Sequence, residues 1–193
     1  MRRARVDRRT GETHVLVDLT LDGGEVSAST GVPFFDHMLD QLGRHSGFGL
    51  VVEAKGDLEI DAHHTVEDVG LALGDALKEA LGDKDGITRY GSVTVPMEDA
   101  LVQVALDLSG RPYLARDVPV PAERIGDYEP VHTNEFMRAL SNRAGITLHI
   151  KLLDGRDPHH IVEAEFKALA VALGQACSKS GRSGTPSTKG VLE

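Results

Sequence analysis

The sequence contains few of the residues that mark several large classes of protein. A single cysteine, Cys177, excludes an intramolecular disulfide framework and predicts a reducing, cytoplasmic location. Tryptophan is absent and aromatic residues make up only 4%, so single-stranded nucleic acid would find no stacking platform. No run of about 18 apolar residues occurs, which predicts that the chain does not cross a membrane.

The net charge and the N-terminal residues exclude further classes of protein. The formal net charge of −9 argues against nucleic acid as a main partner. The basic start, "MRRARVDRR", is followed by no apolar stretch and is therefore not a secretory signal. With 193 residues, 40% of them hydrophobic and 26% charged, the chain has the composition of a soluble globular protein that can bury a core.

Histidine, by contrast, is placed in a repeated pattern. The motif HHxxE occurs in "DAHHTVEDVG" (61–70) and again in "DPHHIVEAEF" (157–166). The two copies consist of His63, His64 and Glu67, and of His159, His160 and Glu163. One copy at a helix start would be ordinary surface sequence, but two copies, each introduced by an aspartate, indicate a duplicated functional site.

Longer segments are repeated around these motifs. The repeated pairs are the strand-like "THVLVDLTLDG" (13–23) and "ALVQVALDLSG" (100–110), the helix-like "PFFDHMLDQLGRH" (33–45) and "TNEFMRALSNRAG" (133–145), and the strand-like "GLVVEA" (49–54) and "GITLHIKLL" (145–153). Each half then closes with the helix that carries HHxxE. Asp61 and Asp157 are predicted N-caps of these helices, and Pro33 and Pro158 suit first-turn positions.

This order of elements predicts an α+β fold in which sheets pack on helices. The first repeat is expected at 12–97 and the second at 98–180, together forming one compact domain and joined through "DKDGITRYGSVTVPME". The tail, 181–193, is rich in Gly, Ser and Thr and is expected to form no regular element.

Helix geometry turns the motif into a prediction of two metal sites. Residues four apart share a helix face, so the first histidine of each motif and its glutamate can chelate one ion. The second histidine points about 100° away from that face. The economical arrangement is an exchange, in which His64 joins the ion held by His159 and Glu163, and His160 joins the ion held by the first motif.

A fourth ligand for each ion is expected from the other repeated helix. His37 lies 26 residues before His63, and Glu135 lies 24 residues before His159, so the two occupy matching places. Mixed histidine and carboxylate ligands without cysteine suit Mn, Fe or Zn. The remaining strand and helix histidines are interpreted as structural: His14, His132 and His149.

These motifs resemble one known family. "GVPFFDHMLDQL", "HHTVED", "LDLSGRPYL", "GITLHI", "HHIVEAEFKA" and "STKGVL" are together similar to the imidazoleglycerol-phosphate dehydratases of histidine biosynthesis, without a fused phosphatase-like domain. The resemblance runs from Glu12 to Leu192. It implies a duplicated fold like domain 2 of ribosomal protein S5, two Mn²⁺ ions per active site, and a large symmetric homo-oligomer of about 24 subunits with active sites at subunit interfaces.

The resemblance also implies the ligands of both ions. One ion is expected on His37, His64, His159 and Glu163, and the other on His63, Glu67, Glu135 and His160. Many members of the family have histidine at the position of Glu135, and either residue type can bind the ion.

The substrate implied by the resemblance has an imidazole ring, a diol and a phosphate. Two metals on the two ring nitrogens would hold the ring as imidazolate, which could expel the neighbouring hydroxyl before a base removes the carbon proton. The resemblance makes Glu12 and His45 candidates for the base and the acid, with Glu163 as a further catalytic residue. Residues implied to contact the substrate are Glu12, His37, His45, His63, Glu67 and His159, with Arg89, Arg111, Ser187, Thr188 and Lys189 at the phosphate.

Two other functions are open at this point. A binuclear metallohydrolase would hold its ions about 3.5–4 Å apart across a bridging water, whereas ions on the two nitrogens of an imidazole would lie roughly 6 Å apart, given metal–nitrogen bonds of about 2 Å. A metal-storing or metal-sensing oligomer would leave the arginines and the tail without a role.

Overall fold

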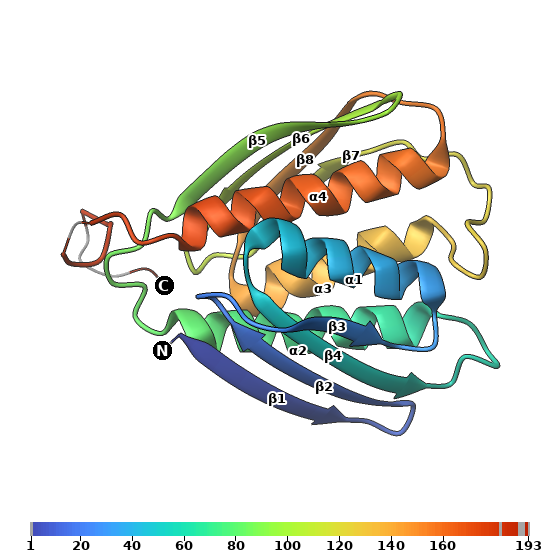
Figure 1. The fold of residues 1–193 in the computed structure, drawn as a ribbon, viewed down its shortest axis with the longest axis horizontal. Helices are drawn as coiled ribbons and strands as arrows, with labels where there is room; N and C mark the ends of the chain where they lie inside the picture. Colours follow the sequence, from blue (N-terminus) through green and yellow to red (C-terminus); the bar gives the residue numbers. More distant parts are fainter. Residues whose placement is uncertain (1, 182, 189–191, 193) are drawn as a thin grey trace.

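The computed structural model describes residues 2–181, 183–188 and 192. It contains the same six elements twice in succession (Figure 1). The first set is β1 (Arg3–Arg9), β2 (Thr13–Thr20), β3 (Val26–Ser29), α1 (Pro33–Ser46), β4 (Gly49–Gly56) and α2 (His63–Leu81). The second set is β5 (Tyr90–Met97), β6 (Ala100–Asp107), β7 (Tyr113–Asp117), α3 (Val131–Ala144), β8 (Thr147–Asp154) and α4 (Pro158–Cys177). The predicted α+β class and internal duplication are confirmed.

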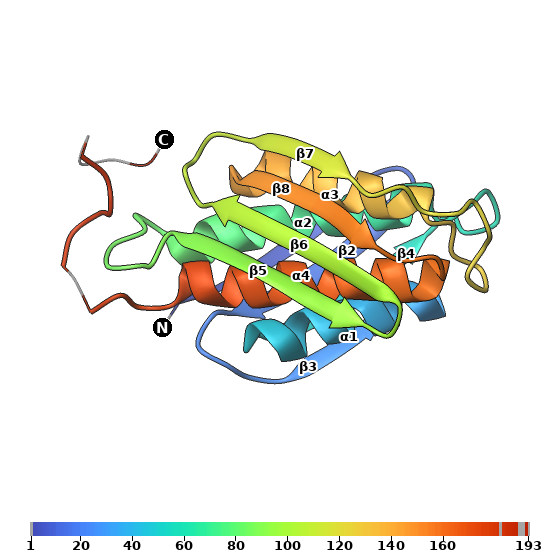
Figure 2. The ribbon, with the colours of Figure 1, turned by 90° about the horizontal axis from the view of Figure 1, so that it is seen from above.

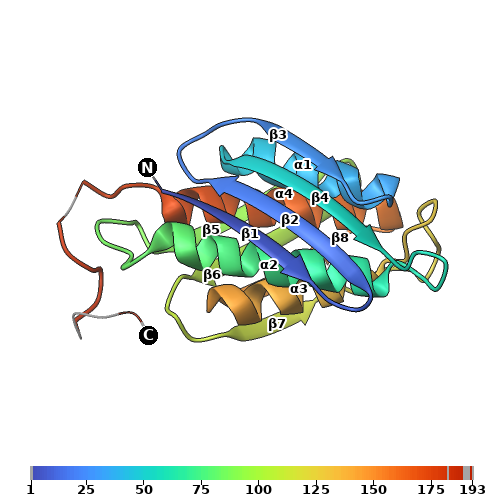
Figure 3. The ribbon, with the colours of Figure 1, turned by 90° about the horizontal axis from the view of Figure 1, so that it is seen from below.

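Each set forms its own four-stranded sheet with the same topology. The strand orders are β1-β2-β4-β3 and β5-β6-β8-β7. In each sheet the short edge strand pairs parallel to its neighbour, β3 with β4 and β7 with β8, and the other pairs are antiparallel. Figure 2 shows the second sheet from its outer side, and Figure 3 shows the first.

The leading strand of each sheet was not anticipated. β1 lies in the basic N-terminal segment, and β5 lies in the segment expected to join the halves. β5 pairs along its whole length with β6, so a boundary between residues 97 and 98 would fall inside a hairpin. The alternation of apolar residues in the β1 sequence is weak because most of its side chains are charged. Ala4 is the one residue of β1 that is fully buried.

The four helices lie between the two sheets and share one core (Figure 1). The strands present alternate residues to it, as the buried and half-buried alternation of β2 and β6 shows. Phe35 of α1, Phe136 of α3 and Phe166 of α4 pack at its centre, with ring centroids 5.1–6.4 Å apart. Because these rings come from both halves, the halves are held together by shared apolar burial.

A buried ion pair also joins the second sheet to its helix. Arg116 of β7 donates from Nε and Nη2 to the carboxylate of Glu165 in α4, at 2.7 and 2.9 Å.

Within the described residues, no helix combines the length and the apolarity needed to cross a lipid bilayer.

All four helices begin at the same end of the molecule, opposite the chain termini (Figure 1). α1 and α4 begin at Pro33 and Pro158, as predicted. Asp157 caps α4 by accepting from the backbone N–H groups of His159 and His160. Asp61 lies one residue before the N-cap position of α2, which is Ala62, but its carboxylate still accepts from the N–H of His63 at 2.7 Å. We call this end the donor end and the opposite end, formed by residues 84–89, 107–111, 176–181 and 183–188, the tail end.

Candidate active site

The donor end gathers every predicted metal ligand. All eight lie in the first two turns of the four helices, so the duplicated fold itself brings them to one end. They are His37 on α1, His63, His64 and Glu67 on α2, Glu135 on α3, and His159, His160 and Glu163 on α4. His37 and Glu135 are each the fifth residue of their helix, which supports the match made between them.

Three of the residues predicted for one ion meet at the start of α4. His159 Nε2 lies 3.1 Å and His37 Nε2 lies 3.6 Å from the same oxygen, Oε2, of Glu163. Lys167, one turn further along α4, donates to the other oxygen at 2.7 Å. The carboxylate therefore presents Oε2 to the two histidines while Oε1 is fixed by the lysine. We call His37, His159 and Glu163 the α4 cluster.

The α4 cluster keeps its glutamate ionised although the side chain is buried. Burial of Glu163 acts to raise its pKa, but the hydrogen bond and the positive charge of Lys167, with His37 and His159 adding to them, leave the pKa below its ordinary value. An ionised carboxylate beside two imidazoles is a suitable ligand set for a divalent cation.

Three residues predicted for the other ion meet between α2 and α3. His63 Nε2 lies 3.8 Å from Glu67 Oε2, and Arg138 donates to Glu67 Oε1 at 2.9 Å. Arg138 also pairs with Glu135, and this hydrogen bond is the main cause that lowers the pKa of Glu135. We call His63, Glu67 and Glu135 the α2 cluster; as in the α4 cluster, a basic side chain holds the glutamate oxygen that faces away from the histidine.

The second histidine of each motif faces a different way, as the helix geometry predicts. His64 places Nδ1 2.9 Å from Oδ2 of Asp57, and His160 places Nδ1 2.7 Å from Oδ1 of Asp99. The hydrogen bond to the carboxylate is the main cause that raises the pKa of each histidine, while that to His160 is the main cause that lowers the pKa of Asp99 to about 2. Each ring is thus fixed through one nitrogen.

One chain alone does not assemble either predicted set of four ligands. Among the described residues, one group of three His or carboxylate donors has all its ligand atoms within 4.8 Å of one another, and it consists of Glu12, Asp57 and His64. His64 therefore lies with carboxylates of its own half, and the α4 cluster lacks its fourth ligand. His160 likewise contacts Asp99 rather than the α2 cluster.

The two residues implied for proton transfer occupy different places. Glu12 lies in the exposed β1–β2 turn, with Oε2 3.7 Å from His64 Nδ1. His45 lies in the last turn of α1, where Nε2 is 2.8 Å from Gln41 Oε1. Partial desolvation and the charge of Lys167 lower the pKa of His45, against an opposing effect of Glu163.

The predicted phosphate-binding residues lie at the tail end. Arg89 pairs in a fork with Asp107, at 2.7 and 3.0 Å, and donates to the carbonyl of Pro186, directly before Ser187 and Thr188. Arg111 follows in the β6–β7 loop, which is joined to Arg89 through the N–H of Leu108. Lys189 lies outside the described residues.

A lysine that the sequence prediction omitted also lies at the tail end. Lys84 is buried, has a positive φ of 60°, and adopts this conformation where α2 gives way to the loop before β5. Its pKa is lowered, first by burial and then by nearby positive groups that include Lys78, Arg89 and Arg111. The tail end therefore collects several cations around Asp107, which suits an anionic ligand.

The donor end and the tail end are separated by the length of the helices. The N–H of Arg89 donates to the carbonyl of Ala176, at the end of α4, whereas the α4 cluster lies at its beginning. α4 has 20 residues and, at about 1.5 Å per residue, is roughly 30 Å long. Within one chain, these two groups of residues cannot bind the same small molecule.

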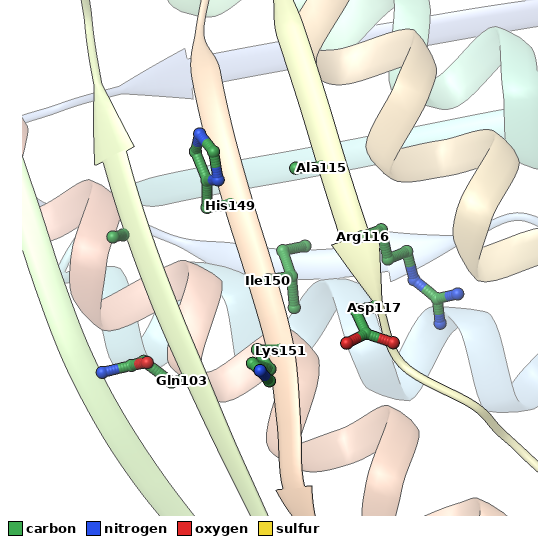
Figure 4. A pocket seen from close by; sticks show the side chains of 8 residues that line it. Gln103, Ala115, Arg116, Asp117, His149, Ile150 and Lys151 are labelled. Carbon is green, nitrogen blue, oxygen red and sulfur yellow. The ribbon is translucent and has the colours of Figure 1, made fainter.

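The three histidines interpreted as structural lie apart from the helix-start clusters or behind them. His149 lines a hollow of about 430 Å³ on the outer face of the second sheet, with Gln103, Asp117 and Lys151 around it (Figure 4). His14 bonds Asp7 at 3.0 Å on the first sheet. His132 is buried beside Tyr128, with its ring centroid 6.2 Å from that of His63.

Sequence reasoning missed the side chains that support the donors. Asp57, Asp99, Lys167 and Arg138 each contact a predicted ligand. Lys167 had a local signal, because it follows Glu163 by four residues on the same helix face. The contacts of Asp99 with His160 and of Arg138 with Glu67 join residues 61 and 71 positions apart, and no spacing rule predicts them.

The fold and these clusters define a duplicated α+β protein that gathers histidine and carboxylate side chains at the starts of its helices. Comparison with known proteins shows the family to which the chain is similar. The family profile described as imidazoleglycerol-phosphate dehydratase matches residues 30–173. Dehydratases of that name from Parafrankia sp. and Acetivibrio thermocellus are each 55% identical over 193 residues, covering 99% of this chain and 99% of theirs.

Solved structures agree with this assignment. The imidazoleglycerol-phosphate dehydratase from Staphylococcus aureus superposes with a TM-score of 0.84 at 36% identity, covering 92% of this chain and 99% of that one. The enzyme from Pyrococcus furiosus, solved in complex with (S)-C348, gives 0.85 at 39% identity, covering 97% and 100%. The chain belongs to the imidazoleglycerol-phosphate dehydratase family.

Proposed function

We propose that the chain dehydrates imidazoleglycerol phosphate to imidazole acetol phosphate and water, a step of histidine biosynthesis, at a site that holds two Mn²⁺ ions. The observation that carries the proposal is the pair of related clusters at the helix starts, each with histidine and ionised carboxylate donors. Family membership favours this reaction over the metallohydrolase alternative.

The ligand chemistry at the donor end fits two divalent cations. His37, His159 and Glu163 would hold one ion, with His64 as the fourth ligand. The second ion would be held by the α2 cluster and His160. When bound, the ions supply Lewis acidity to the imidazole ring of the substrate. Histidine and carboxylate ligands with no thiolate suit Mn²⁺ among the common ions.

The chain's own residues then handle the protons and the phosphate. Glu12 is exposed on a turn beside His64, where a carboxylate can accept a proton from the substrate's carbon chain. The imidazole of His45 can exchange protons with the substrate, and the lowering of its pKa favours the neutral ring near pH 7. Arg89 and Arg111 at the tail end would bind the phosphate through guanidinium N–H donors.

Assembly resolves the separation between the two ends. A substrate whose ring and phosphate are joined by a short carbon chain must contact the donor end of one copy and the tail end of another. His64 and His160 lie outside the clusters of their own chain, so each would join a cluster of another copy. We therefore include a large symmetric homo-oligomer of about 24 copies in the proposal, with sites shared between copies.

A direct assay tests the proposed reaction. The purified chain supplied with Mn²⁺ is expected to convert the substrate to the ketone product without releasing inorganic phosphate. Chelation should abolish turnover, and added Mn²⁺ should restore it, because the donor set requires a cation. An unchanged substrate with every divalent cation tried would refute the dehydratase, and release of phosphate would favour a hydrolase.

The tail gives a second test that concerns binding alone. Ending the chain after Gly184 removes the carbonyl of Pro186 that Arg89 contacts, together with Ser187 and Thr188. We expect KM to rise by roughly 10- to 100-fold, since each charge-assisted hydrogen bond to phosphate contributes about 1.5–3 kcal/mol. Steady-state kinetics measures the change, and circular dichroism checks the fold.

A matched truncation serves as the control for the tail. A chain that ends after Lys189 loses residues 190–193 but retains the Ser-Thr-Lys sequence. It should show the KM of the full-length chain. If both truncations leave KM unchanged, the tail does not bind the phosphate.

A further inference from the structure

Asp57 and Asp99 have no role in the site described so far, yet each contacts one of the two histidines that lie outside the clusters. We infer that Asp57 and Asp99 are positioning residues: each accepts a hydrogen bond from the Nδ1–H of one histidine, Asp57 from His64 and Asp99 from His160. This hydrogen bond leaves Nε2 of each ring as the nitrogen that binds metal. This inference rests on the proposed function. It adds two residues that neither the motifs nor the family resemblance assigned.

Asp57 depends on His64 for its hydrogen bonding. It directly follows β4, and its side chain is only 15% exposed. Oδ2 lies 2.9 Å from His64 Nδ1, whereas Oδ1 is buried and makes no hydrogen bond within the described residues. A desolvated carboxylate is costly without a donor, so the ring N–H is the group that stabilises Asp57 in this place.

Asp99 is held rigidly by the backbone before it contacts His160. It lies in the β5–β6 turn, and its Oδ2 accepts from the N–H groups of Arg156 and Asp157 at 2.7 and 3.1 Å. Its Oδ1 is left to face His160 Nδ1 at 2.7 Å. The carboxylate is therefore tied to the loop that leads into α4, and it fixes the ring relative to that helix.

The choice of nitrogen matters because a neutral imidazole carries one proton. If the proton is on Nδ1, the lone pair is on Nε2, and only a lone pair can bind a metal. A carboxylate at Nδ1 favours that tautomer and fixes the plane of the ring. Losing such a partner costs about 10- to 100-fold in metal affinity.

The two halves obtain this carboxylate from different places. In the second half it comes from the first hairpin turn, between β5 and β6. The corresponding turn of the first half, between β1 and β2, carries Glu12, whose Oε2 is 3.7 Å from His64 Nδ1, whereas Asp57 is at 2.9 Å. Because Asp57 accepts the hydrogen bond from the ring N–H, Glu12 is left available for chemistry on the substrate.

This difference breaks the symmetry of the duplicated site. The second half has Gly155 where Asp57 follows its strand in the first half, so in the part of the chain that the structure describes Asp99 is the one carboxylate hydrogen-bonded to the His160 ring. The reaction is itself asymmetric, since a proton leaves one carbon and a hydroxyl another. Asp99 in the β5–β6 turn fixes the ring of His160, whereas Glu12 in the corresponding β1–β2 turn acts on the substrate.

The test uses variants that keep the size of the side chain. Asp57→Asn and Asp99→Asn are compared with Glu59→Gln, which removes one charge from the same loop as Asp57 at an exposed residue with no hydrogen bond or ion pair seen among the described residues. Asp57→Ala removes every acceptor at that position. The readouts are ¹⁵N NMR of the histidine rings in the metal-free chain, Mn²⁺ binding isotherms, and the separate values of kcat and KM.

We expect each aspartate variant to bind one of its two ions about 10- to 100-fold more weakly. The Nδ1–H tautomer of the facing histidine should lose population, and kcat should recover in excess Mn²⁺. Glu59→Gln should match the wild-type chain in every readout. A purely structural role would lower stability without moving a ring proton from one nitrogen to the other.

Three outcomes would contradict either the proposed function or the positioning role of the two aspartates. If the wild-type chain does not dehydrate the substrate, the proposed function fails independently of the variants. If it does, and the aspartate variants bind both ions as tightly as Glu59→Gln, the positioning role is overturned. Loss of a third ion in Asp57→Asn, with no change at the other two, would show that Glu12, Asp57 and His64 hold a cation themselves, which also overturns it.

Discussion

Glu163→Gln is expected to lower kcat by roughly 10³-fold or more, a loss of about 4 kcal/mol of transition-state stabilisation. One oxygen of Glu163 serves both His159 and His37, so the substitution changes the charge of the whole α4 cluster. A glutamine also presents an amide N–H group that cannot bind a cation. Single-turnover and steady-state rates at saturating Mn²⁺ measure the loss.

The same substitution should affect stability through Lys167. Its side chain is only 19% exposed, and its ammonium pairs with Glu163 at 2.7 Å. Removing the partner of a mostly buried charge leaves that charge uncompensated, and we expect a loss of about 1–3 kcal/mol in the free energy of unfolding. Denaturant unfolding of the metal-free chain measures this cost separately from metal binding.

A double variant separates the two effects. Glu163→Gln combined with Lys167→Met removes both charges and should recover much of the lost stability, but none of the activity. Glu79→Gln, at an exposed position in the last turn of α2, is the matched control and should change neither. Activity within tenfold of wild type in Glu163→Gln would show that Glu163 is not a ligand.

The features of the site that could be predicted from sequence are local ones. Asp157, Pro158 and the HHxxE motif lie within seven consecutive residues, and helix spacing alone gives the cap, the start and the shared face. The duplication was visible because the same order of motifs occurs twice. The divergence of His159 and His160 followed from adjacent positions on a helix.

The parts that could not be predicted depend on tertiary contacts. β1 and β5 become strands through pairing with β2 and β6: most side chains of β1 are charged, and the alternate residues that β5 turns inward are only half-buried apart from Gly91. Asp99 reaches His160 only because the β5–β6 turn folds beside the start of α4. The opposite placement of the predicted ligands and of the arginines predicted to bind phosphate follows from helix length and direction, which motif order does not reveal.

Mixing two variants with different defects should restore activity, measured at a substrate concentration well below the raised KM, if sites are shared between copies. One parent is Glu163→Gln, defective at the donor end, and the other is the chain that ends after Gly184, defective at the tail end. In a randomly mixed oligomer, about a quarter of the sites should combine an intact α4 cluster from one parent with an intact tail from the other. Coexpression followed by assay of the purified assembly measures the recovered fraction.

A second mixture provides the control. His159→Ala and Glu163→Gln alter the same helix, so every α4 cluster in their mixed oligomer carries one defect, and no site should recover. If donor end and tail end of one copy served the same substrate, the first mixture would also show no recovery at that low substrate concentration, because each chain carries one defect. That result would contradict the geometry, since roughly 30 Å of helix separates the two ends of one chain. Recovery in the first mixture alone would therefore establish that each substrate molecule is bound between copies.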